Sequence, residues 1–328
     1  MTRRLFITLI ALTFLFAGCG KTTSQEHVFI DPALASLVPA DAQVLVGANL
    51  EALRKSPMYQ QHLANEFAAR LDEFARQTGL DPRKDIWEIL ACSNGSQTVV
   101  MSRGRFDASE LEPQLDKEGA QRTRYKTYTL FGDEKNAGVF LNSSTAMAGD
   151  TGMVKSILDH RDQPPATPAL LKAAQQVPHG AQFWSVFQGS ALHLPVPESS
   201  DLANVNKILS GLQGGSFHAS FASGFDFTAI GNATNAENAR QIHDAIRALL
   251  GLLRLNTRND QKELLAIYDA VDVKQSDAKV QVAAHIREDL VDQLFNSVIF
   301  GPAMRGAGGR AAAVDKSTAK SPTSSPRE

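Results

Sequence analysis

The side chains best suited to nucleophilic or metal chemistry in this sequence are two cysteines, Cys19 and Cys92, and eight histidines. A catalytic thiol needs a histidine and a positive or helix-terminal environment that lowers its pKa. The segment around Cys92, Leu-Ala-Cys-Ser-Asn-Gly, carries no such signature. We therefore interpret Cys92 as a small, partly buried apolar residue near a turn. Cys19 ends an apolar run near the amino terminus, a setting that favours modification of its thiol over catalysis.

The histidines do not form a recognisable metal-binding motif. No two of them have the H-x-x-x-H spacing, and no cysteine cluster accompanies them. The nearest approach to a ligand group is His285 with Glu288 and Asp289. Acidic residues at the start of a helix complement the helix dipole, which explains this group better than metal binding does. We predict no metal ligand.

Other catalytic templates are also missing. The sequence has no G-x-S-x-G elbow, and the glycines of residues 211–215 precede a predicted strand, the reverse of a nucleotide-binding fingerprint. Trp87 and Trp184 have apolar neighbours, so we interpret both as core residues rather than groove residues. Paired carboxylates have a spacing typical of solvated helix faces: Asp72 with Glu73, Glu110 with Glu112, and Asp289 with Asp292. The sequence therefore predicts no catalytic residue and no cofactor site.

The residues before Cys19 have the order of a signal peptide. Two arginines precede an apolar run over residues 5–16, and small residues occupy positions 17 and 18. The run is shorter than the roughly 20 residues that a membrane-spanning helix needs. We predict a signal peptide over residues 1–18.

Residues 15–19, Leu-Phe-Ala-Gly-Cys, resemble the lipobox of bacterial lipoproteins, with Phe16 standing where leucine is usual. The resemblance implies that Cys19 becomes the lipidated first residue of the mature protein and anchors it to a membrane. The alternative is an ordinary signal peptide, cut near Gly18 or Gly20, that releases a soluble protein. By similarity to proteobacterial sorting, Gly20 rather than aspartate after the cysteine favours the outer membrane, facing the periplasm.

Charge and cysteine content narrow the range of partners. Lysine and arginine total 33 against 35 acidic residues, a net charge of −2. This balance offers no bulk attraction to nucleic acid, so we expect no nucleic-acid partner. If Cys19 carries lipid, Cys92 has no partner for an intramolecular disulfide.

Residues 38–163 are predicted to form a first α+β half. A Val-Pro-Ala-Asp turn at 38–41 leads into a strand over 42–48. Ser56-Pro57 begins a predicted helix with apolar positions 63, 67, 71 and 74, and Asp81-Pro82 begins a short helix carrying Ile86, Trp87 and Leu90. Further strands are expected around 97–102, 125–130, 137–141 and 145–148, with helices after Asp107 and Asp150.

Residues 164–302 are predicted to form a second half. Residues 177–182, Val-Pro-His-Gly-Ala-Gln, repeat the pattern of 38–43, Val-Pro-Ala-Asp-Ala-Gln, and each precedes an apolar strand. A hairpin over 216–230 alternates phenylalanines, among them Phe217 and Phe227, so that one face is aromatic and buried. Thr234 and Glu237 begin the strongest helix, followed by strands at 270–274 and 279–285 and a closing helix. The apolar stripe of the strongest helix contains Ile242, Ile246, Leu249, Leu250 and Leu253.

Both halves therefore have a similar order of strands and helices. We predict an α+β fold of two similar halves, each a mainly antiparallel sheet with helices packed on one face. The alternative is chance similarity at a common Val-Pro turn. Residues 19–37 lack periodicity through most of their length and are predicted to be the lipidated amino terminus and a tether. Residues 303–328, rich in small and polar residues, are predicted to be a disordered tail.

A family resemblance follows from the lipid signal together with three short stretches: residues 39–42 (Pro-Ala-Asp-Ala), 79–86 (from Gly-Leu-Asp-Pro to Asp-Ile) and 105–107 (Arg-Phe-Asp). These resemble exported bacterial proteins grouped only as a domain of unknown function, and the resemblance implies no activity. We expect a lipid-anchored envelope protein with a non-catalytic interaction or structural role and an envelope protein as partner.

Two other functions remain open. One is an envelope enzyme whose active-site residues are dispersed along the sequence. The other is a carrier of a lipid or small ligand that uses the face between Phe217 and Phe227. The carrier hypothesis depends on whether the helix that follows Asn235 covers that face.

Overall fold

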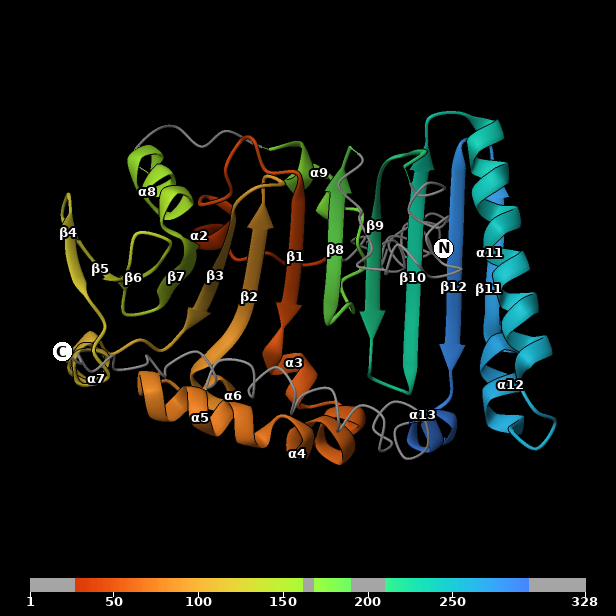
Figure 1. The fold of residues 1–328 in the computed structure, drawn as a ribbon, viewed down its shortest axis with the longest axis horizontal. Coiled ribbons are helices and arrows are strands. Elements are labelled where there is room, and N and C mark those ends of the chain that lie inside the picture. Colours follow the sequence, from red (N-terminus) through yellow and green to blue (C-terminus); the bar gives the residue numbers. More distant parts are fainter. Residues whose placement is uncertain (1–26, 162–167, 190–209, 295–328) are drawn as a thin grey trace, which may run out of the picture.

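A computed structural model describes residues 27–161, 168–189 and 210–294, and the statements below concern these ranges. Cys19, the predicted signal peptide, the predicted tail and residues 19–26 of the predicted tether lie outside the described residues. The described strands form one antiparallel sheet of 12 strands, in the order β11-β12-β10-β9-β8-β1-β2-β3-β7-β6-β5-β4 (Figure 1). The fold is therefore α+β, with a single continuous sheet where two separate ones were expected.

The strands run outward from the centre of the sheet in two series. One series is β1 (Val44–Asn49), β2 (Ile86–Ser93), β3 (Thr98–Gly104), β7 (Thr145–Asp150), β6 (Asn136–Asn142), β5 (Tyr128–Gly132) and β4 (Arg122–Tyr125). The other is β8 (Phe183–Gln188), β9 (Leu212–Ser220), β10 (Phe225–Ala233), β12 (Lys279–Ile286) and β11 (Val271–Ser276). Alternation of buried and less buried residues, clearest in β1 and β8, matches the period of two that a pleated strand imposes.

Helices connect and cover these strands. In the first series they are α2 (Pro32–Ala35), α3 (Leu50–Arg54), the π-helix η1 (Tyr59–Leu63), α4 (Ala64–Glu66), α5 (Ala68–Thr78), α6 (Pro82–Asp85), α7 (Ala108–Lys117) and α8 (Thr151–His160). In the second they are α9 (Ala169–Ala174), α11 (Ala236–Asn256), α12 (Lys262–Ala270) and α13 (Glu288–Leu294). Asp107 caps α7 by accepting from the Ser109 amide, and Asn235 caps α11 by accepting from the Asn238 amide.

The two series meet where β1 and β8 pair antiparallel. Val44 lies opposite Phe187, and Ala48 lies opposite Phe183. Val44 and Phe183 each follow directly on one of the two repeated Val-Pro patterns. If the two Val-Pro patterns are aligned, Val44 corresponds to Phe183 and Ala48 to Phe187. The pairing of β1 with β8 is therefore symmetric about its centre.

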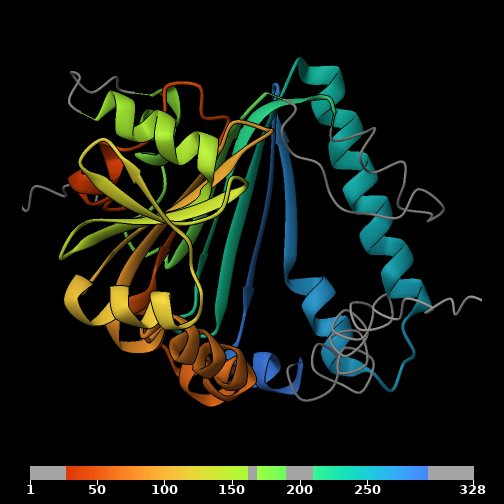
Figure 2. The ribbon, with the colours of Figure 1, turned by 60° about the vertical axis from the view of Figure 1, so that its left-hand side comes forward.

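Helices lie on both faces of the sheet, as Figure 2 shows for α8 and α11. Val186 and Phe187 are neighbours on β8 and must point to opposite faces. Val186 belongs to a core cluster with Val154 and Leu158 of α8, whereas Phe187 packs against a cluster that contains Ile242 of α11. The first face is sealed by α2, α8 and α9, and the second is covered mainly over β10, β11 and β12 by α11.

Most of the expected elements are present, and two local expectations are wrong. Ile86, Trp87 and Leu90 lie in strand β2 rather than in a helix, since α6 ends at Asp85. The helix expected from Ser56 is divided into η1, α4 and α5. Among the described residues, no helix combines the length and apolar character needed to cross a bilayer.

Candidate functional site

The first described residues form a strap, residues 27–31, that binds across the sheet. The Val28 amide donates to the Val177 carbonyl (2.8 Å), and the Asp31 amide donates to Glu88 Oε1 (3.1 Å). Arg103 Nε donates to Asp31 Oδ2 at 2.8 Å, with both side chains mostly buried. The chain that follows the predicted lipid site at Cys19 is therefore fixed firmly to the body from residue 28 onward.

Cys92 lies in the core, as its apolar neighbours predicted. It is 2 % exposed on β2, and burial raises the pKa of its thiol to about 12. A thiol in this environment stays protonated and unreactive at neutral pH. The structure thus gives Cys92 a packing role.

The histidines and acidic residues do not converge on a common point. His285 Nδ1 lies 2.6 Å from Asp226 Oδ1, while Asp289 is held by Arg287, so the sequence group around His285 is divided between two pairs. His62 Nε2 lies 2.6 Å from Asp292 Oδ1 and links η1 to α13. Within the described ranges, no three His, Cys, Asp or Glu side chains are placed to hold a metal ion.

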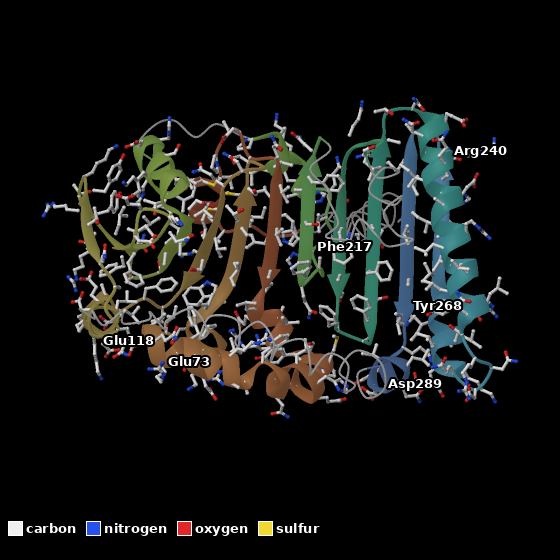
Figure 3. All side chains as sticks on the ribbon, in the orientation of Figure 1. Glu73, Glu118, Phe217, Arg240, Tyr268 and Asp289 are labelled. Atoms are coloured by element: carbon white, nitrogen blue, oxygen red, sulfur yellow. The ribbon has the colours of Figure 1, made fainter. Side chains whose placement is uncertain are left out.

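In each carboxylate pair singled out in the sequence, at least one member forms an ion pair. Glu73 is bound by Arg76 (2.6 Å), and Asp72 is bound by Arg83 (2.7 Å). Glu112 pairs with Arg122 (3.2 Å). Figure 3 shows Glu73 of α5 and Glu118, which directly follows α7, at the periphery of the sheet. These contacts are those of solvated helix faces.

Five phenylalanine rings form a continuous chain across β8, β9 and β10. The ring centroids are 6.1 Å apart for Phe183 and Phe217, 6.3 Å for Phe217 and Phe227, and 5.6 Å for Phe227 and Phe225. Phe221 stacks on Phe225 at 5.1 Å. Aromatic pairs at these separations attract one another beyond simple area burial. We call this chain the aromatic face.

Helix α11 covers this face only in part. Its contacts are with β11, β12 and β10, and Figure 3 places Phe217 on the sheet apart from α11, which carries Arg240. Phe183 is 39 % exposed, and the other four rings are half-buried. The expectation of a buried aromatic face is therefore met only partly.

The carboxyl end of α11 exposes three leucines. Leu252, Leu253 and Leu255 are 54 %, 40 % and 85 % exposed, whereas Ile242 nearer the start of the helix is 3 % exposed. Leu253 is the last residue of the apolar stripe expected on this helix, and it is exposed rather than covered. We call these three residues the leucine end of α11. The sequence indicated this exposure, because at the carboxyl end of α11 apolar residues occur on more than one side of the helix rather than in one stripe.

No family model matches this chain, and no curated protein matches it. Among solved structures it is similar to crystal form I of TP0453, with a TM-score of 0.47 and 10 % identity over 82 % of this chain and 98 % of that one. Crystal form III of TP0453 gives a TM-score of 0.47 and 9 % identity over 82 % and 99 % of the two chains. Crystal form IV gives 0.45 and 8 % over 80 % and 96 %.

Proposed function

We propose that this protein is a lipid-anchored protein of the bacterial envelope with a non-catalytic interaction role. A lipid on Cys19 would hold it to the outer membrane on the periplasmic side. Its partner would be another envelope protein. The observation that carries the interaction role is the leucine end of α11.

Leu252 and Leu255 lie about one helical turn apart on α11 and are both exposed, so they are neighbours on one face of the helix. Neighbouring exposed apolar side chains are typical of interaction sites. Arg254 and Arg258 are near them in the sequence and form ion pairs with Asp269 and Asp260. Arginine is enriched at protein interfaces, whose buried centres are apolar. The composition of the leucine end therefore supports a protein partner.

The strap limits where that partner lies. Eight residue steps separate Cys19 from His27. Even fully extended, a chain of that length reaches no more than about 28 Å. A lipid on Cys19 would thus keep the body, and whatever binds it, close to the membrane surface.

The interaction role is tested by photo-crosslinking in intact cells. A crosslinking amino acid is placed at Leu252 or Leu255, and at Phe74 of α5 as a control that is 41 % exposed and lies on another helix. We expect a discrete protein adduct from the leucine end and none from position 74. Failure to form an adduct, or the same adducts from all three positions, would count against the proposal.

The anchor is tested separately by metabolic labelling with an alkyne fatty acid. The wild-type chain should carry label, and Cys19→Ser should carry none. Label that persists in Cys19→Ser would remove the basis for the lipid anchor without bearing on the partner.

A second candidate role, carriage of an apolar ligand, is favoured by the incomplete cover of the aromatic face. A fluorescent fatty acid titrated into the protein tests it. Phe217→Ala should weaken binding of the probe, while Phe74→Ala on α5 should leave it unchanged. Equal binding by both variants would argue against a carrier.

We further infer that the chain consists of two similar halves, 38–163 and 164–302, joined at β1 and β8. The Asn49 amide donates to the Gln182 carbonyl (2.8 Å), and the matching Gln188 amide donates to the Gln43 carbonyl (2.9 Å). Both α7 and α11 follow the third strand of their series. In an experimental structure, superposing β1-β2-β3 on β8-β9-β10 should bring α7 and α11 to the same face, and opposite faces would contradict the duplication.

A further inference from the structure

A cavity of about 250 Å³ lies where the strap crosses the junction of the two strand series. Val28 of the strap, Gly47 of β1 and Glu88 of β2 contribute to its wall, together with His179 and Trp184 from the chain leading into and along β8. None of these residues belongs to the leucine end or to the aromatic face.

Trp184, which lines this cavity, carries an indole N–H that no described residue accepts from. Its side chain is 3 % exposed and lies against Gly47, where a Cβ would stand 2.3 Å from the indole nitrogen. No described residue accepts a hydrogen bond from the indole N–H, although every fully sealed side-chain polar atom in the described ranges has a partner. The indole N–H is therefore not fully sealed, and Trp184 is part of the wall of this cavity. Buried tryptophan N–H groups usually find an acceptor, so this one is available to a ligand.

Glu88 presents a carboxylate with unused capacity. Its Oε1 accepts from the Asp31 amide at 3.1 Å, the one hydrogen bond that Glu88 makes through its side chain in the described structure. The nearest cation, Arg103, is committed to Asp31 and to oxygens of Ser144 and Thr145. Burial raises the pKa of Glu88 above its ordinary value, and the nearby Asp31 carboxylate adds to the rise, whereas the hydrogen bond from the Asp31 amide and the charge of Arg103 offset it only in part. A cation brought into the cavity would supply a further counter-charge.

The remaining wall is apolar. Val28 and Ala181 line it, both packed with the core cluster that contains Trp184, and Phe29 is also part of the wall. Ile89 follows Glu88 on β2 and directs its side chain to the opposite face of the sheet, against Leu50 and Phe140. At about 30 Å³ for each water-sized group, the cavity holds roughly eight non-hydrogen atoms. The cavity thus combines an acceptor for a cation, a donor for a neutral oxygen and a short apolar surface.

We propose that this cavity binds a primary ammonium group adjacent to a carbonyl oxygen, as found at the amino terminus of a peptide. The ammonium donates to Glu88, the carbonyl accepts from the Trp184 N–H, and a short apolar side chain packs against Val28 and Ala181. The proposal does not depend on the interaction role of α11.

Ligand-observed NMR titration of the full chain tests the proposal with three small probes. Leucinamide carries the ammonium, the carbonyl and an apolar side chain. The matched probe 4-methylpentanamide lacks only the amino group, and 3-methylbutylamine lacks the carbonyl. Leucinamide should bind wild-type protein at least tenfold more tightly than 4-methylpentanamide, since hydrogen bonds to charged groups are the stronger kind. Equal binding of these two probes, or no binding of leucinamide, would overturn the proposal.

Variants assign the two polar contacts. Glu88→Gln should abolish the preference for leucinamide over 4-methylpentanamide, whereas Glu51→Gln, at an exposed glutamate of α3, should leave it intact. Trp184→Phe should weaken leucinamide and leave 3-methylbutylamine unchanged. A preference that survives Glu88→Gln would refute the assigned ammonium site. The comparison of probes on wild-type protein keeps the test valid even if a variant fails to fold.

Discussion

Gly47 is the residue at which a single methyl group should disturb the centre of the sheet most. It lies on β1 opposite Trp184 of β8. An ideal Cβ at this position would stand 2.1 Å from Trp184 Cε2 and 2.3 Å from Cζ2. Non-bonded carbons rest about 3.5–4.0 Å apart, so Gly47→Ala forces the indole to retreat by roughly 1.5 Å.

The indole cannot retreat without cost. Trp184 belongs to the largest core cluster and is almost fully buried. Overpacking of this kind costs about 1–3 kcal/mol. Replacing glycine by alanine also lowers the conformational entropy of the unfolded chain, which stabilises the folded state by about 0.4–1 kcal/mol. The net expectation is a loss of about 1–2 kcal/mol in the free energy of unfolding.

Urea denaturation followed by circular dichroism measures this loss. The matched control is Gly138→Ala on β6, where an ideal Cβ would stand 3.6 Å from the Ala148 Cβ, an ordinary contact. Gly138→Ala should be neutral or slightly stabilising. Replacing Trp184 by alanine should remove most of the penalty of Gly47→Ala, because the two residues are in contact. An unchanged urea midpoint for Gly47→Ala would refute the packing argument.

Three further predictions follow from buried polar groups. Because the pKa of Glu88 is raised in the folded protein, its contribution to stability is present below the ordinary pKa of 4.5 and is lost as the pH rises through the folded pKa. Glu88→Gln should therefore flatten this part of a plot of urea midpoint against pH. An unaltered slope would contradict the assignment. In a Cys19→Ser chain, Cys92 should resist iodoacetamide at pH 8 until urea unfolds the protein, and fast alkylation of the native chain would show that the thiol is not sealed. Arg103→Met should lower the free energy of unfolding by about 1–3 kcal/mol, because it leaves the partly buried Asp31 carboxylate without its partner, and a midpoint equal to wild type would show that the strap does not need this contact.

The sequence was sufficient to locate the elements whose patterns are strong and local. The strand after the Val-Pro-Ala-Asp turn, the hairpin that contains Phe217 and Phe227, and the helix that follows Asn235 are all present. The assignment failed at Ile86, Trp87 and Leu90. Apolar residues at those positions fit one face of a helix as well as a strand, and pairing with both β1 and β3 selects the strand. Tertiary contacts decided a choice that local spacing left ambiguous.

Features that depend on distant parts of the chain could not be predicted. The repeated Val-Pro pattern marked both β1 and β8, yet nothing in it indicates that the two strands pair and join all the strands in one sheet. Trp184 was correctly interpreted as core. Its unused N–H could not be foreseen, since Glu88 and the strap reach the same cavity from far away in the sequence.

The strap joins the segment that contains Cys19 to the wall of the cavity at Glu88. Its upstream end leads toward Cys19, and its downstream end forms a wall of the cavity and donates to Glu88 through the Asp31 amide. A ligand that binds Glu88 therefore acts on the same segment that fixes the tether to the body. Conversely, any force that pulls the strap away from Val177 removes a wall of the cavity and should weaken the binding of an ammonium ligand. Under the proposed lipid anchor, attachment at Cys19 and binding of the proposed ligand at Glu88 would be coupled through residues 27–31, and the coupling would require no movement of the sheet.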